Sequence, residues 1–287
     1  MKRFKRITII GVGLIGGSIG LAAKNRRLAE EVVGVFRHRS TLNRALRHKA
    51  VDKGFMTIEE GVRDADLIIL ATPVHSIPVL VREAVNFAKK GAIITDAGST
   101  KGWIVAKCEN ALGRHSQVSF VGSHPMAGSE HTGVEFAKAD LFEGSLCIVT
   151  RTVSTDKRAL GVVSGFWRSL GAKVKIMSPS EHDRTVALVS HLPHVVAFSL
   201  AGAVPGREME CSAEGFRDTT RIASSDPELW ADIFLTNKKA LLEAARMFES
   251  YYGKVIKAIA GGQYLATVKM LGKAKAKRDK FLYGKRR

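Results

Sequence analysis

Residues 7–23 read ITIIGVGLIGGSIGLAA. A short apolar run, Ile7–Ile10, leads directly into a G-x-G-x-x-G pattern, and the residues after it are apolar at helical spacing. We interpret this order as strand, glycine turn and helix, which is the context in which the pattern binds a dinucleotide. The glycines permit a tight turn and close approach of a pyrophosphate to the positive end of the helix. The residues expected to contact this cofactor are Gly11, Gly13, Leu14, Ile15 and Gly16.

The first residues have an alternative interpretation. Met1-Lys2-Arg3 before an apolar run is typical of a secretory signal. Glycines interrupt the apolar stretch, however, and no small-residue cleavage site precedes the charged segment Lys24–Arg27. We therefore expect a nucleotide-binding segment here.

The composition is that of a globular protein. The chain has 287 residues, 45% hydrophobic and 25% charged, enough for one large or two ordinary domains. No apolar run approaches the roughly 20 residues that cross a bilayer, so we expect no membrane association. Cys108, Cys147 and Cys211 are far apart and form no CxxC pair. This pattern favours reduced thiols in the cytoplasm and argues against a metal site.

The net charge of +18 is partly local, because Lys273–Arg287 contains eight Lys or Arg and one Asp. Such a tail can bind nucleic acid or an anionic membrane, or it can be a solvated extension. We favour the solvated extension. The remaining positive charge is consistent with a polyanionic cofactor and substrate.

The end of the second expected strand, Val32–Phe36, selects the form of the cofactor. Enzymes that use NAD usually place an acid there, about 20 residues after the glycines, to bind the ribose 2′-hydroxyl. From the end of this strand onward, no acid appears in the chain before Asp52. Basic and hydroxyl side chains would instead bind a 2′-phosphate. We therefore expect NADP in preference to NAD, bound by Arg37, Arg39, Ser40 and the neighbouring Thr41.

Strands and helices alternate through the first 177 residues, which predicts an α/β fold with a doubly wound parallel sheet. Asp66–Ala71 is an apolar strand that ends in Thr72-Pro73, at the edge where ligands bind in such sheets. Ser154 is expected to cap a helix. The other expected strands are Ala92–Thr95, Ser119–Val121, Leu146–Thr150 and Lys173–Met177, the last of which should close the sheet.

From Ser178 onward the pattern is helical. We therefore predict a dinucleotide-binding domain over residues 1–178 and a helical domain over 179–287, the latter including the basic tail. Ser178-Pro179-Ser180-Glu181 should begin a helix. Pro193 lies inside that helix and should kink or open it. His191 and His194, three residues apart, should share a face.

The chain resembles the prephenate/arogenate dehydrogenase (TyrA) family from Gly11-x-Gly13-Leu14-Ile15-Gly16-Gly17-Ser18 to the helix after Trp230, which is nearly its whole length. Five further motifs in the right order carry the resemblance: Asp96-x-Gly98-Ser99-x-Lys101, His124-Pro125-Met126-Ala127-Gly128-x-Glu130, Ser190-His191-Leu192-Pro193-His194, Gly215-Phe216-Arg217-Asp218-Thr219-Thr220-Arg221 and Ser225-Asp226-Pro227-x-x-Trp230. The resemblance implies oxidative decarboxylation of a cyclohexadienol: hydride passes from C4 to nicotinamide, CO2 leaves, and the ring becomes aromatic.

The resemblance also implies roles for single residues. His124 accepts the hydrogen bond of the substrate 4-hydroxyl, Ser99 helps to orient it, and Arg221 pairs with a substrate carboxylate. The residues that face the substrate from the helical domain and the pocket entrance are Ser190, His191, His194 and Glu130. The helical half is similar to a dimerisation domain, so a homodimer is expected. Neither a mutase segment before Gly11 nor an ACT-type regulatory segment after Phe281 is expected. Any feedback inhibition by tyrosine should therefore act at the active site, where tyrosine would mimic the product.

Glu214 departs from the family pattern, which often has glycine before Gly215-Phe216. The resemblance implies that this segment approaches the substrate side chain, which is a keto acid in prephenate and carries an ammonium in arogenate. A carboxylate at Glu214 would favour arogenate by charge pairing.

Two other functions compete with this interpretation. A β-hydroxyacid dehydrogenase would share the domain order but needs a catalytic lysine in a GxxxK-type helix motif, for which we find no equivalent. A non-enzymatic nucleotide-sensing or nucleic-acid-binding protein would use the basic tail. It would leave Arg221 and Ser190–His194 without a role.

Overall fold

The computed structural model describes residues 3–113, 117–129 and 131–283. The chain forms two compact units, Met1–Lys238 and Lys239–Arg287. Secondary structure changes from mixed to all-helical at Ser178, so helices of the expected second domain belong to the first compact unit. The division into domains at 178/179 stays a prediction.

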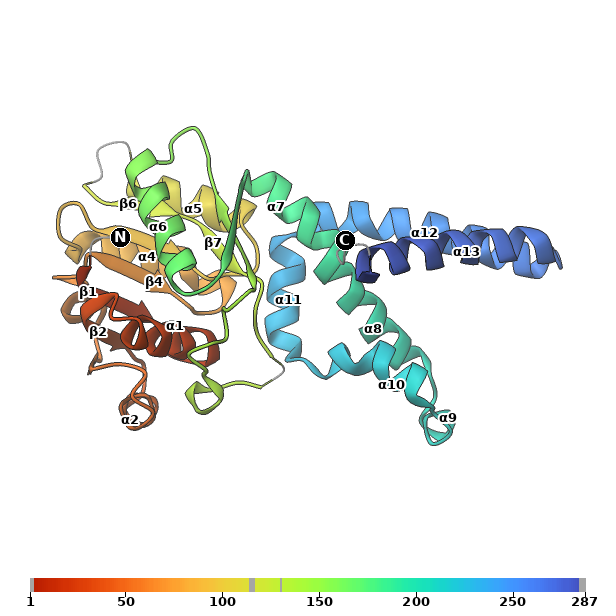
Figure 1. Ribbon diagram of the computed structural model, residues 1–287, viewed down its shortest axis with the longest axis horizontal. Helices are drawn as coiled ribbons and strands as arrows, with labels where there is room; N and C mark the ends of the chain where they lie inside the picture. Colours follow the sequence, from red (N-terminus) through yellow and green to blue (C-terminus); the bar gives the residue numbers. More distant parts are fainter. Residues whose placement is uncertain (1–2, 114–116, 130, 284–287) are drawn as a thin grey trace. The chain divides into compact units, whose positions relative to one another are not determined.

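A six-stranded parallel sheet in the order β3-β2-β1-β4-β5-β6 forms the centre of the first unit (Figure 1). The order reverses between β1 and β4, which confirms the predicted doubly wound fold. The strands are β1 (Phe4–Ile10), β2 (Ala29–Val35), β3 (Lys53–Phe55), β4 (Leu67–Leu70), β5 (Ile93–Asp96) and β6 (Ser119–Val121). The helices between them are α1 (Leu14–Asn25), α2 (Arg39–Arg47), α3 (Ile58–Val62), α4 (Ile77–Phe87) and α5 (Gly102–Leu112).

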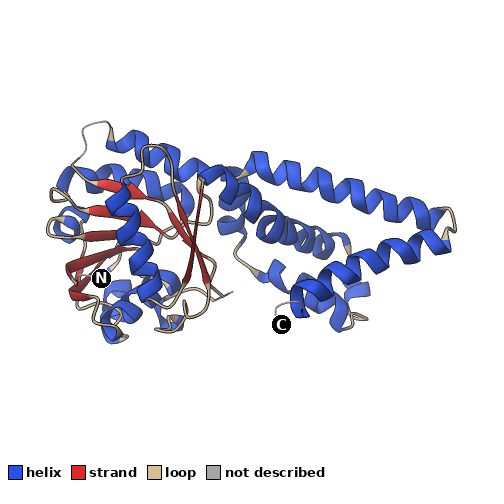
Figure 2. Cartoon of the chain, turned by 45° about the horizontal axis from the view of Figure 1, so that its top comes forward, coloured by secondary structure: helices blue, strands red, loops and turns tan. Residues whose placement is uncertain are grey.

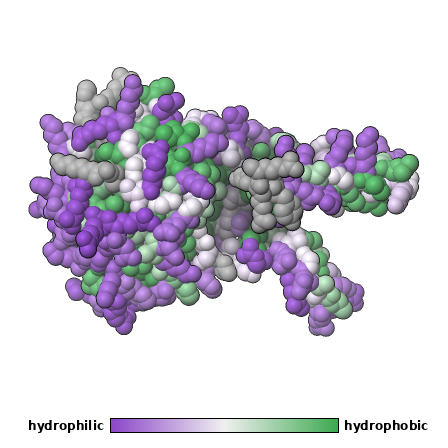
Figure 3. All heavy atoms as spheres, in the orientation of Figure 1, coloured by the Kyte–Doolittle hydropathy of each residue, from purple (hydrophilic) through white to green (hydrophobic). Residues whose placement is uncertain are grey.

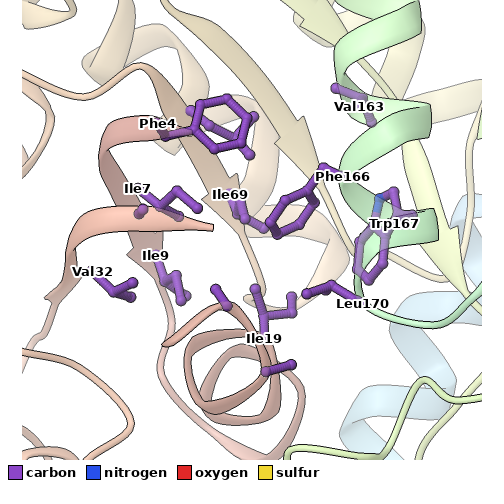
Figure 4. Close-up of a cluster of buried hydrophobic side chains, with 14 of the residues drawn as sticks. Phe4, Ile7, Ile9, Ile19, Val32, Ile69, Val163, Phe166, Trp167 and Leu170 are labelled. Atoms are coloured by element: carbon purple, nitrogen blue, oxygen red, sulfur yellow. The ribbon is translucent and has the colours of Figure 1, made fainter. Parts of the chain in front are cut away.

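Successive residues of the central strands face opposite sides of this sheet, and both sides are apolar. In β4, Leu67 and Ile69 join one buried cluster, whereas Ile68 and Leu70 join the other. Figure 4 shows the first cluster, in which Phe166 from a later helix packs near β1 and β4. A strand that is covered on both faces reads as a continuous apolar run, which is why these strands were predictable.

The last strands form a separate sheet, so the prediction that Lys173–Met177 closes the main sheet is wrong. The second sheet has the order β7 (Ser123–Pro125), β8 (Leu146–Thr150) and β9 (Lys173–Met177), with β7 antiparallel to β8 (Figure 2). The chain leaves the main sheet at Gly122, because β6 ends at Val121 and β7 pairs with β8 instead.

The helix between β8 and β9 is α6 (Lys157–Ser169). Its N-cap is Asp156, whose carboxylate accepts the backbone N–H of Ala159 at 2.7 Å. The predicted cap, Ser154, instead lies 3.0 Å from the hydroxyl of Thr152. The expectation for Ser154 is therefore wrong, because an acidic residue closer to the helix supplies the same acceptor.

Ser123 joins the two sheets. Its N–H donates to Asp96 Oδ1 at 3.1 Å, and its hydroxyl accepts the indole N–H of Trp167 at 2.9 Å. Lys101 Nζ donates to the Ser123 carbonyl at 2.8 Å and forms an ion pair with Asp96. The side chains of Lys101 and Asp96 are fully buried. One buried ion pair therefore fixes the point at which the chain passes from the main sheet to the second.

The helical segment begins with α7 (Pro179–Val186), capped by Ser178 as predicted. A π-helical turn, Ala187–His191, leads into α8 (Leu192–Ala203), and Pro193 lies in the first turn of α8. The predicted opening of the helix before Pro193 is thus confirmed, since proline has no N–H to continue the α-helical ladder. The later helices of this unit are α9 (Gly206–Met209), α10 (Glu214–Thr220) and α11 (Pro227–Thr236).

The run Pro179–Ala203 corrects one expectation from the sequence. It is a 25-residue helical run whose 18-residue window has mean hydropathy 1.6 and is 22% buried, so by length and composition it qualifies as a membrane span. Ser190, His191 and His194 lie among its apolar residues, so the high mean hydropathy of the run is not evident from the sequence. A helix that packs against other protein surface can have the same length and hydropathy, so this one helix is weak evidence of a membrane span.

The second unit is a helical hairpin. Helices α12 (Lys238–Ala260) and α13 (Tyr264–Tyr283) lie side by side in Figures 1 and 2, and Tyr251 OH donates to the Met270 carbonyl at 3.2 Å. Gly262, with φ of +63°, makes the turn between them. Apolar side chains remain in its surface (Figure 3), among them Met247, Tyr264, Leu265 and Leu271. Both helices lie in the segment for which the sequence predicts a helical pattern.

The buried Lys101–Asp96 pair yields a stability prediction. Lys101→Met should lower the free energy of unfolding by about 3–5 kcal/mol, because it leaves a buried carboxylate without its cation. The double variant Asp96→Asn/Lys101→Met should recover part of this loss, since the uncompensated charge is gone. Urea unfolding monitored by circular dichroism measures both. A Lys101→Met protein as stable as the unmodified protein would contradict the ion-pair account.

Candidate active site

The glycine turn lies at the switch point of the main sheet, where β1 and β4 are neighbours. Gly11 has φ of +91°, a conformation that favours glycine. A Cβ at Gly11 would lie 2.6 Å from Thr72 Cγ2 and 2.7 Å from the Ala71 carbonyl oxygen. The structure thus brings together two predicted cofactor segments, the glycine turn after β1 and Thr72-Pro73 after β4. Pro73 is exposed, and Thr72 is half-buried.

The N-terminus of α1 fits a dinucleotide pyrophosphate. Gly13 is the N-cap, no side chain caps the helix, and its first turn contains no acid. A Cβ at Gly13 would meet no atom within 4 Å, whereas one at Gly16 would collide with the Gly11 carbonyl oxygen. Open space above uncapped N–H groups is what a phosphate needs. Leu14 and Ile15, half-buried, form the first helical residues.

The end of β2 exposes the residues expected at the cofactor ribose. Arg37, Arg39 and Ser40 are exposed, and neither arginine pairs with a carboxylate of the described residues. Asp52, the first acid after the end of β2, is occupied elsewhere: it accepts the Val32 N–H at 2.8 Å and pairs with Lys24 at 2.7 Å. The Asp52 carboxylate is therefore not free to bind a 2′-hydroxyl.

His124 lies in β7, just beyond the carboxyl edge of the main sheet, and is buried. Its Nδ1 lies 2.8 Å from Nε2 of His182 on α7, and the rings are tilted with centroids 5.1 Å apart. His182 Nδ1 lies 2.8 Å from Asp183 Oδ1. The backbone N–H groups of Lys101 and Gly102, at the start of α5, each donate to the Asp183 carboxylate at 2.8 Å. The result is a buried chain from an α-helix N-terminus through Asp183 and His182 to His124.

The charges of this chain follow from its surroundings. Burial, reinforced by His182, Lys101 and His191, lowers the pKa of His124 well below 6.5. Burial also lowers the pKa of His182, against the opposing effect of Asp183. Burial alone would raise the pKa of Asp183, but the hydrogen bonds from His182, Lys101 and Gly102 lower it below 3.8. At neutral pH both imidazoles are uncharged and the carboxylate is ionised.

The histidines of the π-helical turn form a second cluster around Trp230. His194 stacks on Trp230 with ring centroids 3.4 Å apart, and its Nδ1–H donates to the Ser190 carbonyl at 2.9 Å. His191 is buried edge-on to Trp230, and its Nδ1 lies 3.1 Å from Asn237 Nδ2. Burial lowers the pKa of His191 to about 4. The predicted shared face of the two histidines is thus covered by one indole.

Asn237 connects the two clusters. Its side-chain N–H donates to the Asp183 carbonyl at 2.9 Å as well as facing His191. Asn237 is itself buried. The π-helical turn and the His124 chain are therefore parts of one hydrogen-bonded network.

No hydrogen bond among the described residues joins Arg221, Ser99 or Glu214 to this network. Arg221 is exposed at the start of a 3-10 turn, Arg221–Ser224, and its charge acts with burial to lower the pKa of His194. Ser99 is half-buried in the turn between β5 and α5. Glu214 is exposed at the first residue of α10 and bonds to no described residue. Glu130 lies outside the described residues.

Sequence reasoning missed His182, Asp183 and Asn237. A His-Asp pair in the first turns of a helix is typical of an exposed, dipole-complementing position, so nothing in its spacing indicates burial. Trp230, named above only as part of a motif, packs against both His191 and His194. Within the described residues no group of three or more His, Cys, Asp or Glu could hold a metal ion.

Residues 19–176 match the prephenate dehydrogenase nucleotide-binding domain, and residues 178–273 match the prephenate dehydrogenase dimerization domain. A cyclohexadienyl dehydrogenase of Zymomonas mobilis is 36% identical over 275 residues, covering 92% of each chain.

Two solved structures are also similar. Prephenate dehydrogenase of A. aeolicus, in complex with hydroxyphenyl propionate and NAD+, has a TM-score of 0.89 and 33% identity, covering 96% of this chain and 98% of that one. Synechocystis arogenate dehydrogenase has a TM-score of 0.81 and 28% identity, covering 96% and 99%.

Two glycine variants test the dinucleotide site. Gly13→Ala should leave the melting temperature close to that of the unmodified protein, because its Cβ enters open space, but should weaken dinucleotide binding at least tenfold by occupying the phosphate position. Gly16→Ala should lower the melting temperature, because its Cβ collides with Gly11. Thermal unfolding and a fluorescence titration with reduced cofactor separate the effects. Equal dinucleotide affinity in Gly13→Ala would contradict the placement of the phosphate.

Proposed function

This chain belongs to the prephenate dehydrogenase family, and from that premise we propose how its residues carry out the reaction. The chain is an NAD(P)-linked oxidoreductase of tyrosine biosynthesis that oxidatively decarboxylates a cyclohexadienyl substrate. Prephenate gives 4-hydroxyphenylpyruvate, and arogenate gives tyrosine. When bound, the nicotinamide accepts the hydride that leaves C4 of the ring.

One observation carries the assignment of His124: it is a buried, uncharged imidazole at the carboxyl edge of the sheet, whose Nε2 bonds to none of the described residues. A neutral imidazole with a free ring nitrogen can accept a hydrogen bond from the substrate 4-hydroxyl and draw off its proton. Because CO2 loss and aromatisation drive the reaction, polarising this hydroxyl and orienting the ring are the main tasks left to the protein.

Arg221 and several polar side chains orient the substrate. Arg221, without a carboxylate partner among the described residues, pairs with a substrate carboxylate, for which its planar fork is suited. His194 and Ser190 contact the substrate from the helical segment, and Ser99 orients the reacting hydroxyl. His191 is buried against Asn237 and Trp230, so we assign it the support of the π-helical turn beneath these groups.

The cofactor is NADP in preference to NAD. Arg37 and Arg39 are exposed and unpaired at the end of β2, and Asp52 is engaged by Lys24. Two guanidinium groups and the Ser40 hydroxyl would bind the 2′-phosphate. The A. aeolicus structure contains NAD+. The proposed preference for NADP therefore rests on the side chains of this chain alone.

The substrate side chain is recognised near α10. Glu214 is exposed and has no cationic partner among the described residues, so its charge is available to an ammonium group. We therefore assign arogenate as the better substrate. Glu130 is assigned to the pocket entrance on the family resemblance alone.

The assembly is a homodimer formed through the helical segments. The dimerization-domain match covers residues 178–273, which include the apolar run Pro179–Ala203 and most of the helical hairpin. A second copy of the chain would cover the apolar side chains exposed there. We place the protein in the cytoplasm, in keeping with its free cysteines Cys108, Cys147 and Cys211. The basic tail beyond Gly272 is assigned to solvation, with neither a nucleic-acid nor a membrane partner.

The main test is reduced-nicotinamide absorbance with prephenate or arogenate, each against NAD or NADP. Turnover should be highest with arogenate and NADP. His124→Asn should lower kcat by about 10²–10⁴-fold, the range expected for loss of a positioned proton acceptor. His48→Asn, an exposed histidine on α2's C-terminal side, is the matched control and should be unaffected. No turnover in any of the four combinations, with folded protein, would favour the nucleotide-sensing alternative.

Cofactor preference has its own test. Arg37→Ala and Arg39→Ala should each raise KM for NADP about tenfold or more, as expected for loss of a charge-assisted hydrogen bond. KM for NAD should stay unchanged, since NAD lacks the 2′-phosphate. Arg47→Ala, an exposed arginine at the other end of α2, is the control. An equal rise in KM for NADP and NAD would mean that the arginines do not recognise the 2′-phosphate.

A further inference from the structure

The hydrogen bonds behind His124 fix where its protons lie. An ionised Asp183 only accepts, so His182 Nδ1, 2.8 Å away, must carry a hydrogen. A neutral His182 then has a bare Nε2, which can only accept. His124 Nδ1, 2.8 Å from that atom, must therefore carry a hydrogen. It follows that Nε2 of His124 is the bare nitrogen.

We propose that His182 and Asp183 are positioning residues that hold His124 in the tautomer with a free Nε2 and take up its Nδ1 proton when Nε2 becomes protonated. This inference rests on the proposed role of His124 as the proton acceptor. Its parts are the buried histidine pair and the carboxylate that is fixed by the N–H groups of Lys101 and Gly102.

The substrate hydroxyl gives its proton to His124, and the ring oxygen takes a proton back at the end of the reaction. As hydride leaves C4, the substrate O–H bond breaks, its electron pair forms the C4 carbonyl, and the proton binds His124 Nε2. The Nδ1 proton of His124 can then shift to His182 Nε2. When the bond to the ring carboxylate breaks, its electron pair enters the ring, CO2 leaves, and the ring oxygen retakes the proton as a phenol. The two histidines end as they began.

The carboxylate is needed because the neighbouring charges oppose a buried imidazolium. Lys101 and His191 face His124 in addition to His182, while Lys101, Asp96 and Asp183 face His182. Lys101 is already paired with Asp96, so Asp183 is the anion in contact with the relay. The arrangement follows the logic of a catalytic triad, in which a buried acid sets the tautomer of the base.

Three variants test the relay. His182→Leu removes the acceptor of the His124 Nδ1 proton and should lower kcat about 100-fold or more. His182→Gln keeps an amide oxygen near the position of Nε2 and should recover about tenfold of that loss, because the tautomer is kept but the proton cannot be taken. Asp183→Asn should lower kcat as much as His182→Leu, because an amide N–H facing His182 would reverse both tautomers.

A pH profile separates positioning from structure. In Asp183→Asn the acid limb of kcat/KM should move to lower pH, because loss of the anion disfavours the imidazolium. Val186→Ala is the structural control: it opens a cavity at a buried position of α7, one turn from His182. Its acid limb should not move, although its melting temperature falls.

The relay would be overturned by His182→Leu turnover within about threefold of the unmodified enzyme, a difference too small for loss of a proton-transfer partner. It would also be overturned if activity in all variants, Val186→Ala included, followed melting temperature with no movement of the acid limb. Failure of the proposed function looks different: the unmodified enzyme would then be inactive, or His124→Asn active. If His182→Leu does not fold, the Asp183→Asn profile decides.

Discussion

The carboxylate of Asp183 is the group on which the site depends. It accepts hydrogen bonds from the backbone N–H groups of Lys101 and Gly102 at the start of α5, and it lies 2.8 Å from His182 Nδ1. The π-helical turn follows Asp183 along the chain, and Asn237 contacts both His191 in that turn and the backbone carbonyl of Asp183. A buried anion is costly unless its acceptor positions are filled, and here two backbone donors and an imidazole fill them. One side chain therefore joins the end of the main sheet, the start of the helical segment and the histidine proposed to act on the substrate.

The rest of the fold places the glycine turn and His124 at the same edge of the main sheet. The strand order places the glycine turn and Thr72 together at the switch point, and the uncapped N-terminus of α1 leaves donors for a pyrophosphate. The buried Lys101–Asp96 pair then holds Ser123, and so fixes the residue next to His124. The glycine turn and His124 thus lie at one edge of the sheet because the parallel strands end there and because β7 turns away from the sheet at Ser123.

The sequence predicted what periodicity and local chemistry determine. Apolar runs covered on both faces gave the strands, Pro193 gave the opened helix, and the motif of His124 pointed to the site. It did not predict the second sheet, because the antiparallel pairing of β7 with β8 depends on tertiary contacts. Nor did it predict that His182-Asp183 is buried, since two ionisable residues near a helix start are normally solvated. The apolar character of Pro179–Ala203 was missed because polar residues and Pro193 interrupt it. The boundary at 178/179 and the roles of Arg221, Glu214 and Glu130 stay predictions.

The central claim is that a buried carboxylate fixes the tautomer of an uncharged His124. Nitrogen NMR of protein labelled with 15N-histidine, with His124 assigned by comparison with His124→Asn, measures this directly at neutral pH. The account predicts a protonated, pyrrole-like Nδ1 and an unprotonated, pyridine-like Nε2. The opposite pattern, or two protonated nitrogens, would contradict it.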